Sequence, residues 1–336
     1  MRSARLLVRT LADPASAAAL APPQWTALIT AARAESLLGS LAFRLAAEAL
    51  PTKVAAILED ARRDAGYART QALWEAEMAR RALAASGAPV ILLKGTAFAA
   101  AGLEAGQGRS IGDLDILVPK DRLDEVEEAL LAAGWEWVKE DRYDDIYYRC
   151  WMHELPPLIH RTRDRMIDVH HTILPLTARP TPDAGALVED SVELAGGMRV
   201  LCPEDMIVHA AAHLFADGDL AGGLRNLWDI DRLLRRFGAE HDFWNRLARR
   251  ASRHGLLPHV TRALRLAARV YETPVDPGIA GTLRGADRLY LRRLLARDGW
   301  GRQTRPATRM AFYVRSHWLR MPPLMLARHL WQKVRH

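Results

Sequence analysis

Apolar and polar positions alternate with helical spacing over most of the first 86 residues. Residues 24–50 and 53–86 are rich in Ala, Leu, Arg and Glu, and Pro51 separates the two segments. These residue types favour helices, and their apolar members recur at the three- and four-residue intervals of one helix face. The pattern predicts an N-terminal helical region covering residues 1–86.

From residue 87 to 176 the pattern changes to short apolar runs. Five segments have the apolar, aromatic or β-branched content of strands: 90–93, 113–118, 135–140, 145–151 and 166–173. Helical spacing returns in residues 96–103 and in 121–133, where Gly134 provides a C-terminal stop. We expect an α+β core here, with a small mixed β-sheet between the N-terminal helices and a C-terminal helical domain.

A Pro- and Thr-rich linker, residues 175–182, leads back to helical spacing. Pro203-Glu204-Asp205 places proline and acids in a first helical turn, where they fit best. Four helices are predicted, over residues 204–216, 220–237, 240–254 and 256–271. We expect a helical domain over 177–285 and a basic helical tail over 286–336.

Positive charge is concentrated in that tail. The chain has 47 basic and 40 acidic residues, and residues 288–336 contain 12 of the basic ones and one acid, which leaves 35 and 39 elsewhere. Such a tail favours polyanions. Residues 309–335 mix Arg with Trp, Phe, Leu and Met, so they fit either a packed helical pair with basic outer faces or a polyanion- or lipid-binding surface.

Composition narrows the class of protein. Hydrophobic residues make up 49% and charged residues 26%, as in soluble globular proteins. Two cysteines, Cys150 and Cys202, provide neither a disulfide framework nor zinc-finger spacing, and we expect a cytoplasmic location. The N-terminal apolar runs are too short for a signal peptide, and the absence of an 18-residue apolar run predicts no membrane span.

The chemistry-bearing pattern is a pair of aspartates in an apolar run. Asp113 and Asp115 occupy alternate positions of the predicted strand 113–118, so both side chains point to the same face. Neighbouring carboxylates repel unless a cation lies between them. Oxygen ligands alone suit Mg²⁺ or Mn²⁺, and a turn at Gly95-Thr96 follows the preceding apolar run. The alternative is an ordinary solvated face.

This order of a strand, a Gly-Thr turn, a helix and Asp-x-Asp on the next strand resembles the nucleotidyltransferase fold of the DNA polymerase β superfamily. That superfamily carries a third acid on a later strand, and the resemblance assigns it to Asp168, with Asp164 and Glu154 as competitors. Thr96 stands where Ser is common, and 16 residues separate Thr96 from Asp113.

More narrowly, residues 87–237 resemble an uncharacterised bacterial nucleotidyltransferase family. The matching elements are Leu93-Lys94-Gly95, Arg109, Asp113, Asp115, Asp168, His170, Pro203-Glu204-Asp205, His213, Arg225 and Asp229-Ile230.

The resemblance implies a site for two divalent metal ions and a nucleoside triphosphate (NTP). Asp113 and Asp115 would bridge the ions, and Asp168 would bind the one that activates the acceptor. The phosphates would meet the Gly95-Thr96 backbone at a helix N-terminus, with Lys94 and Arg109 as cations. His170 shares a strand face with Asp168, so we expect it to touch either the substrate or the oxygens around the metal ligands. A lysine stem lying along the core and an ordinary loop arginine are the alternatives for these two cations.

His209 and His213 are spaced for a metal on one helix face. The pattern lacks the glutamate of zinc proteases and an evident third ligand. We therefore expect a buried His213 that bonds to Arg225 or Asp229.

The sequence thus predicts an enzyme that moves a nucleoside monophosphate (NMP), most simply AMP, from an NTP to the hydroxyl of an acceptor, either a small molecule or a macromolecule. Two alternatives remain: a nucleotide-binding module without transfer activity, and a toxin–antitoxin type nucleotidyltransferase acting on protein or RNA.

Overall fold

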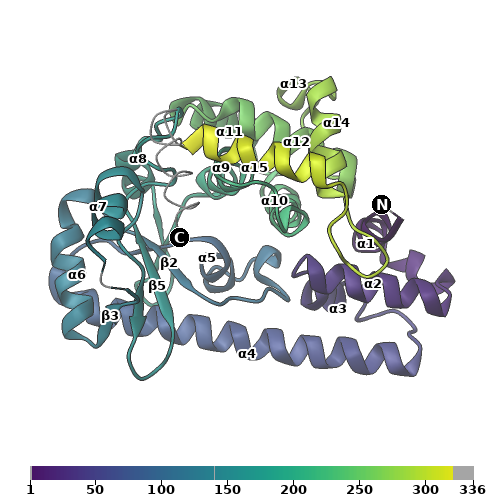
Figure 1. The fold of residues 1–336 in the computed structure, drawn as a ribbon, viewed down its shortest axis with the longest axis horizontal. Helices are drawn as coiled ribbons and strands as arrows, with labels where there is room; N and C mark the ends of the chain where they lie inside the picture. The colour runs from purple at the N-terminus through teal and green to yellow at the C-terminus, as the bar shows by residue number, and fades with distance from the viewer. Residues whose placement is uncertain (1, 140, 321–336) are drawn as a thin grey trace.

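The computed structural model describes residues 2–139 and 141–320, and in this part of the chain helices surround one mixed β-sheet (Figure 1). The α-helices are α1 (Arg2–Ala12), α2 (Pro22–Ala34), α3 (Leu38–Arg44), α4 (Thr52–Leu83), α5 (Lys94–Ala100), α6 (Leu123–Ala132), α7 (Arg142–Trp151), α8 (Ala184–Glu189), α9 (Pro203–Ala212), α10 (Gly223–Phe237), α11 (Phe243–Arg253), α12 (Leu257–Tyr271), α13 (Pro277–Ala280), α14 (Gly285–Leu294) and α15 (Pro306–Arg320).

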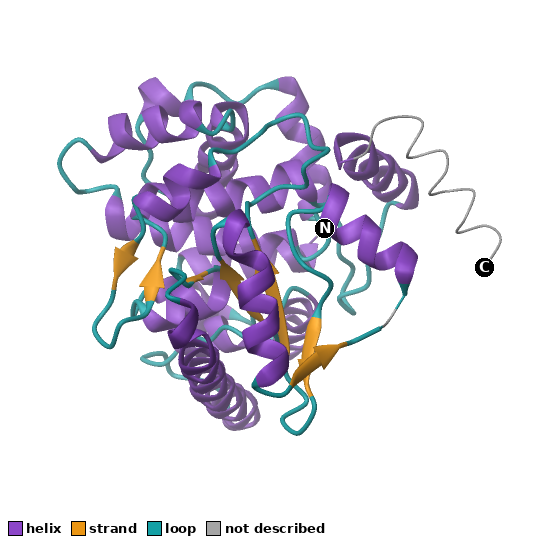
Figure 2. Cartoon of the chain, turned by 90° about the vertical axis from the view of Figure 1, so that its left-hand side faces the viewer, coloured by secondary structure: helices purple, strands orange, loops and turns teal. Residues whose placement is uncertain are grey.

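The strands are β1 (Ile91–Leu92), β2 (Leu114–Leu117), β3 (Trp135–Trp137), β4 (Leu158–His160), β5 (Met166–His170), β6 (Val192–Glu193) and β7 (Arg199–Val200). They form a sheet in the order β3-β4-β5-β2-β1-β7-β6. β5 is parallel to β2, β1 is parallel to β7, and the other neighbours are antiparallel. Figure 2 views the end of the molecule where these strands gather. The α+β fold class is confirmed.

The described part of residues 1–86 is mostly helical. The first predicted segment contains two helices, α2 and α3, because Ser36 between them adopts a left-handed backbone with φ of 54°. The second segment is the long helix α4, which packs on α3, α5 and α6 along one side of the molecule (Figure 1).

The strand predicted at residues 145–151 is wrong, because this segment belongs to helix α7. Its aromatic content suggested a strand, yet its side chains interact at helical spacing. Arg149 Nε donates to Asp145 Oδ1 at 2.7 Å, and the rings of Tyr147 and Trp151 lie 6.0 Å apart. The missing neighbour of β5 is instead β4, and residues 192–200 add the unpredicted pair β6 and β7.

The four helices predicted after residue 203 are confirmed as α9 to α12, which pack on one another. α9 continues into a π-helical turn at His213–Asp217. Trp228, Tyr271, Phe215 and Phe243 are fully buried among these helices.

The described part of the tail packs on these helices. Phe312 of α15 is buried and contacts the ring of Tyr290 of α14. The second half of the predicted helical pair, residues 321–336, lies outside the described residues. Within the described residues, none of the helices is both long and apolar enough to cross a bilayer.

Candidate active site

Two acidic side chains lie side by side at the centre of the sheet. The parallel register of β2 and β5 pairs Asp115 with Asp168, so both carboxylates project from the same face on adjacent strands. Asp115 is buried and Asp168 is half-buried. Asp113 is exposed and directly precedes β2, and its charge acts on Asp168 and Lys94. The register therefore brings together acids that are more than 50 residues apart in the sequence.

The connection from β1 to α5 places a lysine against this pair. The amide of Leu93 donates to the carbonyl of Asp115 at 3.0 Å, which holds the end of β1 beside β2. Lys94 follows with φ of 48°, a strained conformation for a residue with a side chain. Its ammonium binds Asp115 Oδ1. The sequence predicted a phosphate role for Lys94, and in this structure it neutralises a predicted metal ligand.

His170 approaches Asp115 from the other side. Its Nε2 lies 3.0 Å from Asp115 Oδ1, and its Nδ1 lies 3.2 Å from Glu154 Oε2. Glu154 reaches this position because residues 153–155 run antiparallel beside the end of β5. The amide of Leu155 donates to Val169 and that of His171 donates to His153, both at 2.9 Å.

The two central carboxyls have opposite pKa shifts. Burial alone would raise the pKa of Asp115, but the hydrogen bond from His170 and the charge of Lys94 outweigh it and keep the pKa below the ordinary value. Burial raises the pKa of Asp168 to about 6, and the charges of Asp115 and Glu154 add to this effect. Asp168 is therefore the acid whose negative charge is poorly compensated.

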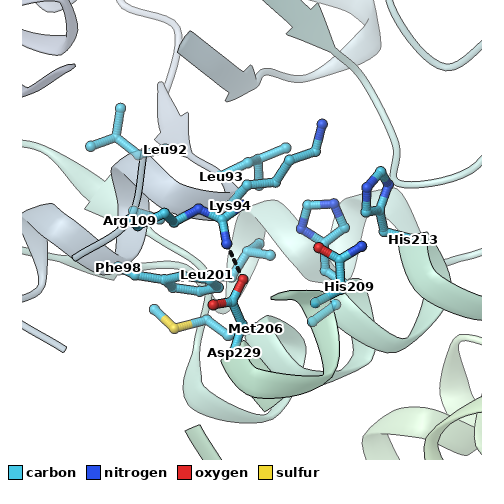
Figure 3. Close-up of a pocket in the computed structure, with 13 residues that line it drawn as sticks. Leu92, Leu93, Lys94, Phe98, Arg109, Leu201, Met206, His209, His213 and Asp229 are labelled. Carbon is cyan, nitrogen blue, oxygen red and sulfur yellow. Dashed lines mark hydrogen bonds and ion pairs between the residues drawn. The ribbon is translucent and has the colours of Figure 1, made fainter. Parts of the chain in front are cut away.

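A narrow pocket with an internal volume of about 30 Å³ adjoins the carboxylates where Lys94 faces α9 and α10 (Figure 3). Its apolar lining comes from Leu92, Leu93, Ala97, Phe98, Leu201, Met206 and Ala210. Its polar lining comes from Lys94, Arg109, His209, His213, Asn226 and Asp229. Burial, followed by the charges of Lys94 and His213, moves the pKa of His209 well below its ordinary value, so this wall carries neutral imidazole.

Arg109 crosses the turn at Gly95 and pairs with Asp229 of α10, as Figure 3 shows. A Cβ on Gly95 would lie 2.4 Å from Arg109 Nε, so only glycine leaves room for this side chain. Asp229 also binds Arg225, which in turn donates to Ser40 Oγ at 2.6 Å. The arginine predicted to bind phosphate therefore connects the turn to the helical region in this structure. Thr96, the next residue after Gly95, is buried.

Sequence reasoning missed part of this cluster. Glu154 was only a competitor for the third acid, and His153 had no assigned role. Both precede β4 in an irregular segment, so no alternation pattern marks them. A contact between His213 and Asp229 or Arg225 stays a prediction, although His213 and Asp229 line the same pocket.

The mixed sheet with Asp115 and Asp168 on its central parallel strands is consistent with a nucleotidyltransferase-like fold. A family model described as "uncharacterised nucleotidyltransferase" matches residues 21–272, which is most of the chain. The chain therefore belongs to this nucleotidyltransferase family. A search of curated proteins found no significant match.

Proposed function

We propose that the protein is a metal-dependent nucleotidyltransferase that moves an NMP, most simply AMP, from an NTP to an acceptor hydroxyl. The observation that carries the proposal is the register of β2 and β5, which sets Asp115 beside Asp168 with Asp113 nearby. Family membership supports a nucleotide substrate and an acceptor.

The donor set fits divalent ions that prefer oxygen. Lys94 and His170 both bind Oδ1 of Asp115, and we assign Oδ2 to a metal ion. Burial, followed by the like charges of Asp115 and Glu154, raises the pKa of Asp168, and a bound cation would offset these effects. We assign Asp113, Asp115 and Asp168 as ligands for Mg²⁺ or Mn²⁺. When bound, such ions activate the acceptor oxygen and neutralise the leaving pyrophosphate.

The remaining side chains bind and orient the nucleotide. The first intrahelical hydrogen bond of α5 runs from the amide of Ala97 to Leu93, so the amides of Lys94, Gly95 and Thr96 precede it and point out of the helix start. Lys94, which now neutralises Asp115, supplies its charge to the phosphates in our proposal. His170 keeps Asp115 oriented through its Nε2 contact.

The pocket beside Lys94 suits an uncharged part of the substrate. Phe98, Leu201 and Met206 form apolar walls, and Arg109 with Asp229 closes one side. Apolar walls with a few placed polar groups are typical of small-molecule sites. We propose that the base or a small acceptor contacts these side chains, since the pocket itself, about 30 Å³, is too small to enclose either.

Release of pyrophosphate in the presence of Mg²⁺ tests the mechanism. We expect Asp113→Asn, Asp115→Asn and Asp168→Asn each to lower turnover by about 10²–10³-fold, the scale of losing one preorganised charged group. Asp121→Asn changes an exposed acid outside the cluster and should retain full turnover. Full activity in the Asp115→Asn variant would remove the mechanism.

Incubation with a cell extract and labelled ATP, GTP, CTP or UTP would identify the base and the acceptor together. Label on a protein or RNA would favour the toxin–antitoxin alternative, and deletion of residues 309–336 tests whether the tail contributes to that binding. Calorimetry with a non-hydrolysable NTP and Mg²⁺ measures nucleotide binding. If the protein binds this NTP but releases no pyrophosphate from ordinary NTPs, it is a binding module.

A further inference from the structure

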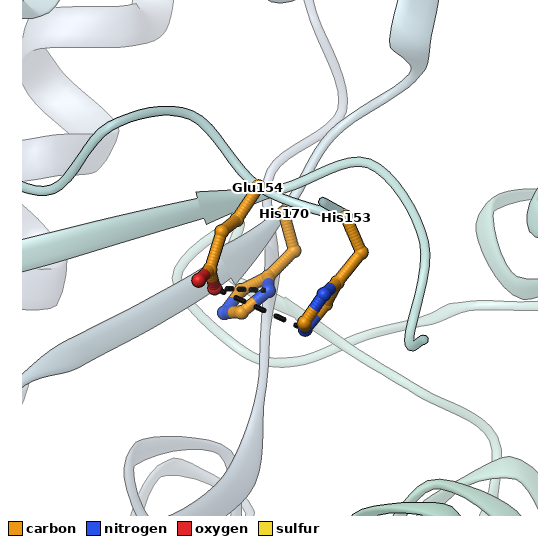
Figure 4. A group of neighbouring side chains, drawn as sticks. All are labelled: His153, Glu154 and His170. Carbon is orange, nitrogen blue, oxygen red and sulfur yellow. Dashed lines mark ion pairs between the residues drawn. The ribbon is translucent and has the colours of Figure 1, made fainter. Parts of the chain in front are cut away.

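We propose that His153, Glu154 and His170 form a binding site for a transition-metal ion of the Zn²⁺ class, separate from the oxygen-only ligands Asp113 and Asp168. The proposal does not depend on nucleotidyl transfer. It rests on the geometry of three side chains that meet at the end of β5 (Figure 4).

The spacing of the three ligand atoms suits a metal ion. All of them lie within 4.8 Å of one another. Glu154 Oε2 lies 3.2 Å from His170 Nδ1 and 3.9 Å from His153 Nε2. In a tetrahedral site with bonds of about 2.0–2.1 Å, ligand atoms lie about 3.3–3.4 Å apart.

The hydrogen bond from Nε2 of His170 leaves its other ring nitrogen, Nδ1, able to bind a metal ion. Nε2 faces the buried carboxylate of Asp115 at 3.0 Å, which is an acceptor, so the imidazole proton belongs on Nε2. Nδ1 then carries a lone pair directed toward Glu154. The His170 side chain is only 3% exposed, and its Nδ1 makes no hydrogen bond within the described residues.

Two electron-rich atoms 3.2 Å apart are stabilised when a cation, either a metal ion or a proton, lies between them. A carboxylate that holds one imidazole nitrogen while the other binds metal is the common arrangement around protein zinc. Asp115 has this relation to His170.

His153 provides the third ligand. Its ring lies against that of His170, with centroids 5.1 Å apart and planes tilted by 31°, and its Nε2 is the nitrogen that lies 3.9 Å from Glu154 Oε2. Two imidazoles and one carboxylate favour Zn²⁺ or Co²⁺ over Mg²⁺, which prefers oxygen alone. Three protein ligands also leave one coordination position open.

The test starts from the full chain after a chelator has removed bound metal, and it measures metal binding by this protein. Competition between the protein and a chromogenic chelator measures Zn²⁺ stoichiometry and affinity, and the visible absorption of bound Co²⁺ reports tetrahedral geometry. We expect one tightly bound Zn²⁺ per chain and a tetrahedral Co²⁺ spectrum. His153→Gln and Glu154→Gln should each weaken Zn²⁺ binding at least ~10-fold, since they remove direct ligands.

Two kinds of control separate this site from others. His241→Gln removes an exposed histidine and should leave Zn²⁺ binding unchanged. Asp113→Asn and Asp168→Asn should retain the Zn²⁺ and lose turnover, so failure of the zinc site and failure of the proposed function are distinguishable.

Either of two results would overturn the proposal: wild-type protein without tight Zn²⁺, or unchanged affinity in both the His153→Gln and Glu154→Gln variants. The cation between Glu154 and His170 would then be a proton. If one variant does not fold, the other variant and the Co²⁺ spectrum of the wild-type protein still decide whether the metal site exists.

Discussion

Asp115 and Asp168 show how far two identical side chains can differ on one face of a sheet. They are register partners on adjacent strands. Lys94 and His170 both bind Asp115, whereas Asp168 faces mainly the like charges of Asp115 and Glu154. The immediate neighbours, rather than the strand pattern, decide which carboxyl is stable as an anion.

Asp168 should therefore lower the stability of the metal-free protein. Its pKa of about 6 in the folded state lies above the ordinary 3.8, so the folded state binds the proton more tightly. Stability falls as the pH rises from about 4 to 6, and the full penalty is present above pH 6. We expect Asp168→Asn to raise the free energy of unfolding at pH 7.5 by about 1–2 kcal/mol in EDTA.

Urea unfolding at pH 7.5 and pH 4 measures this effect, and the gain should disappear at the lower pH. Added Mg²⁺ should stabilise the wild type and have less effect on the variant, because a ligand stabilises only the state that binds it. Equal stability of the two proteins at pH 7.5 in EDTA would contradict the assigned charge repulsion.

Gly95 illustrates a single position that the tertiary structure requires. The Cβ of Gly95→Ala would meet Arg109, which Asp229 holds in place. We expect a loss of about 1–3 kcal/mol, typical of overpacking, measured by chemical unfolding. Gly66 lies inside α4, and a Cβ there would meet nothing within 4 Å. Gly66→Ala should instead stabilise by about 0.5–1 kcal/mol, and a similar gain at Gly95 would refute the steric argument.

At the scale of elements, the most accurate sequence predictions were the long helices. Their amphipathic repeat is a local signal that extends over several turns, as in α4 and α10. β6 and β7 contain two residues each, too few for any alternation to be visible. α7 was mistaken for a strand because its aromatic residues suit both conformations, and its contact from Arg149 to Glu127 of α6 is tertiary.

His259 in helix α12 should make the stability of the folded protein decrease at acid pH. Burial lowers the pKa of this histidine to about 4, and the charges of Arg262 and Arg315 add to the effect. The unfolded chain takes up the proton near pH 6.5, before the folded chain does, so stability falls between pH 6.5 and 4.

We expect His259 to account for a loss of about 2–3 kcal/mol in the free energy of unfolding over this interval. The His259→Gln variant lacks this titrating group, so its free energy of unfolding should fall correspondingly less. Thermal unfolding at pH 7, 5.5 and 4.5 measures the difference. His241→Gln, at an exposed position, should follow the wild type. Parallel pH dependences for wild type and His259→Gln would exclude this contribution.

Across the whole molecule, buried ion pairs connect segments that are far apart in the sequence. Glu35, at the end of α2, accepts from Arg297 Nε at 2.7 Å and from the amide of Leu224 at 3.2 Å. Arg297 also donates to the carbonyls of Ala34 and Gly301. This pair joins the N-terminal helices to the segment after α14, and both of its side chains are buried.

Removing one partner should be costly because it leaves the other charge buried. We expect Glu35→Ala to lower the free energy of unfolding by about 3–5 kcal/mol. The double variant Glu35→Ala, Arg297→Ala should lose less than the sum of the single variants, since neither charge is left alone. Urea unfolding of the four proteins gives the coupling energy.

The exposed pair Asp60 and Arg63 on α4 is the matched control. Its Asp60→Ala variant should change stability by at most about 1 kcal/mol. A comparable loss for Glu35→Ala and Asp60→Ala would show that burial does not govern the worth of these pairs.

Amino-acid order alone was enough for the long helices and for β1, β2 and β5, because these depend on the short-range pattern of apolar residues. Three-dimensional folding decided that Asp168 lies next to Asp115, that Lys94 and Arg109 find carboxylate partners, and that His153 and Glu154 join His170. Those contacts join residues from 16 to 120 positions apart. Strand register and helix packing determine these contacts, and neither can be recognised from the local pattern of residues.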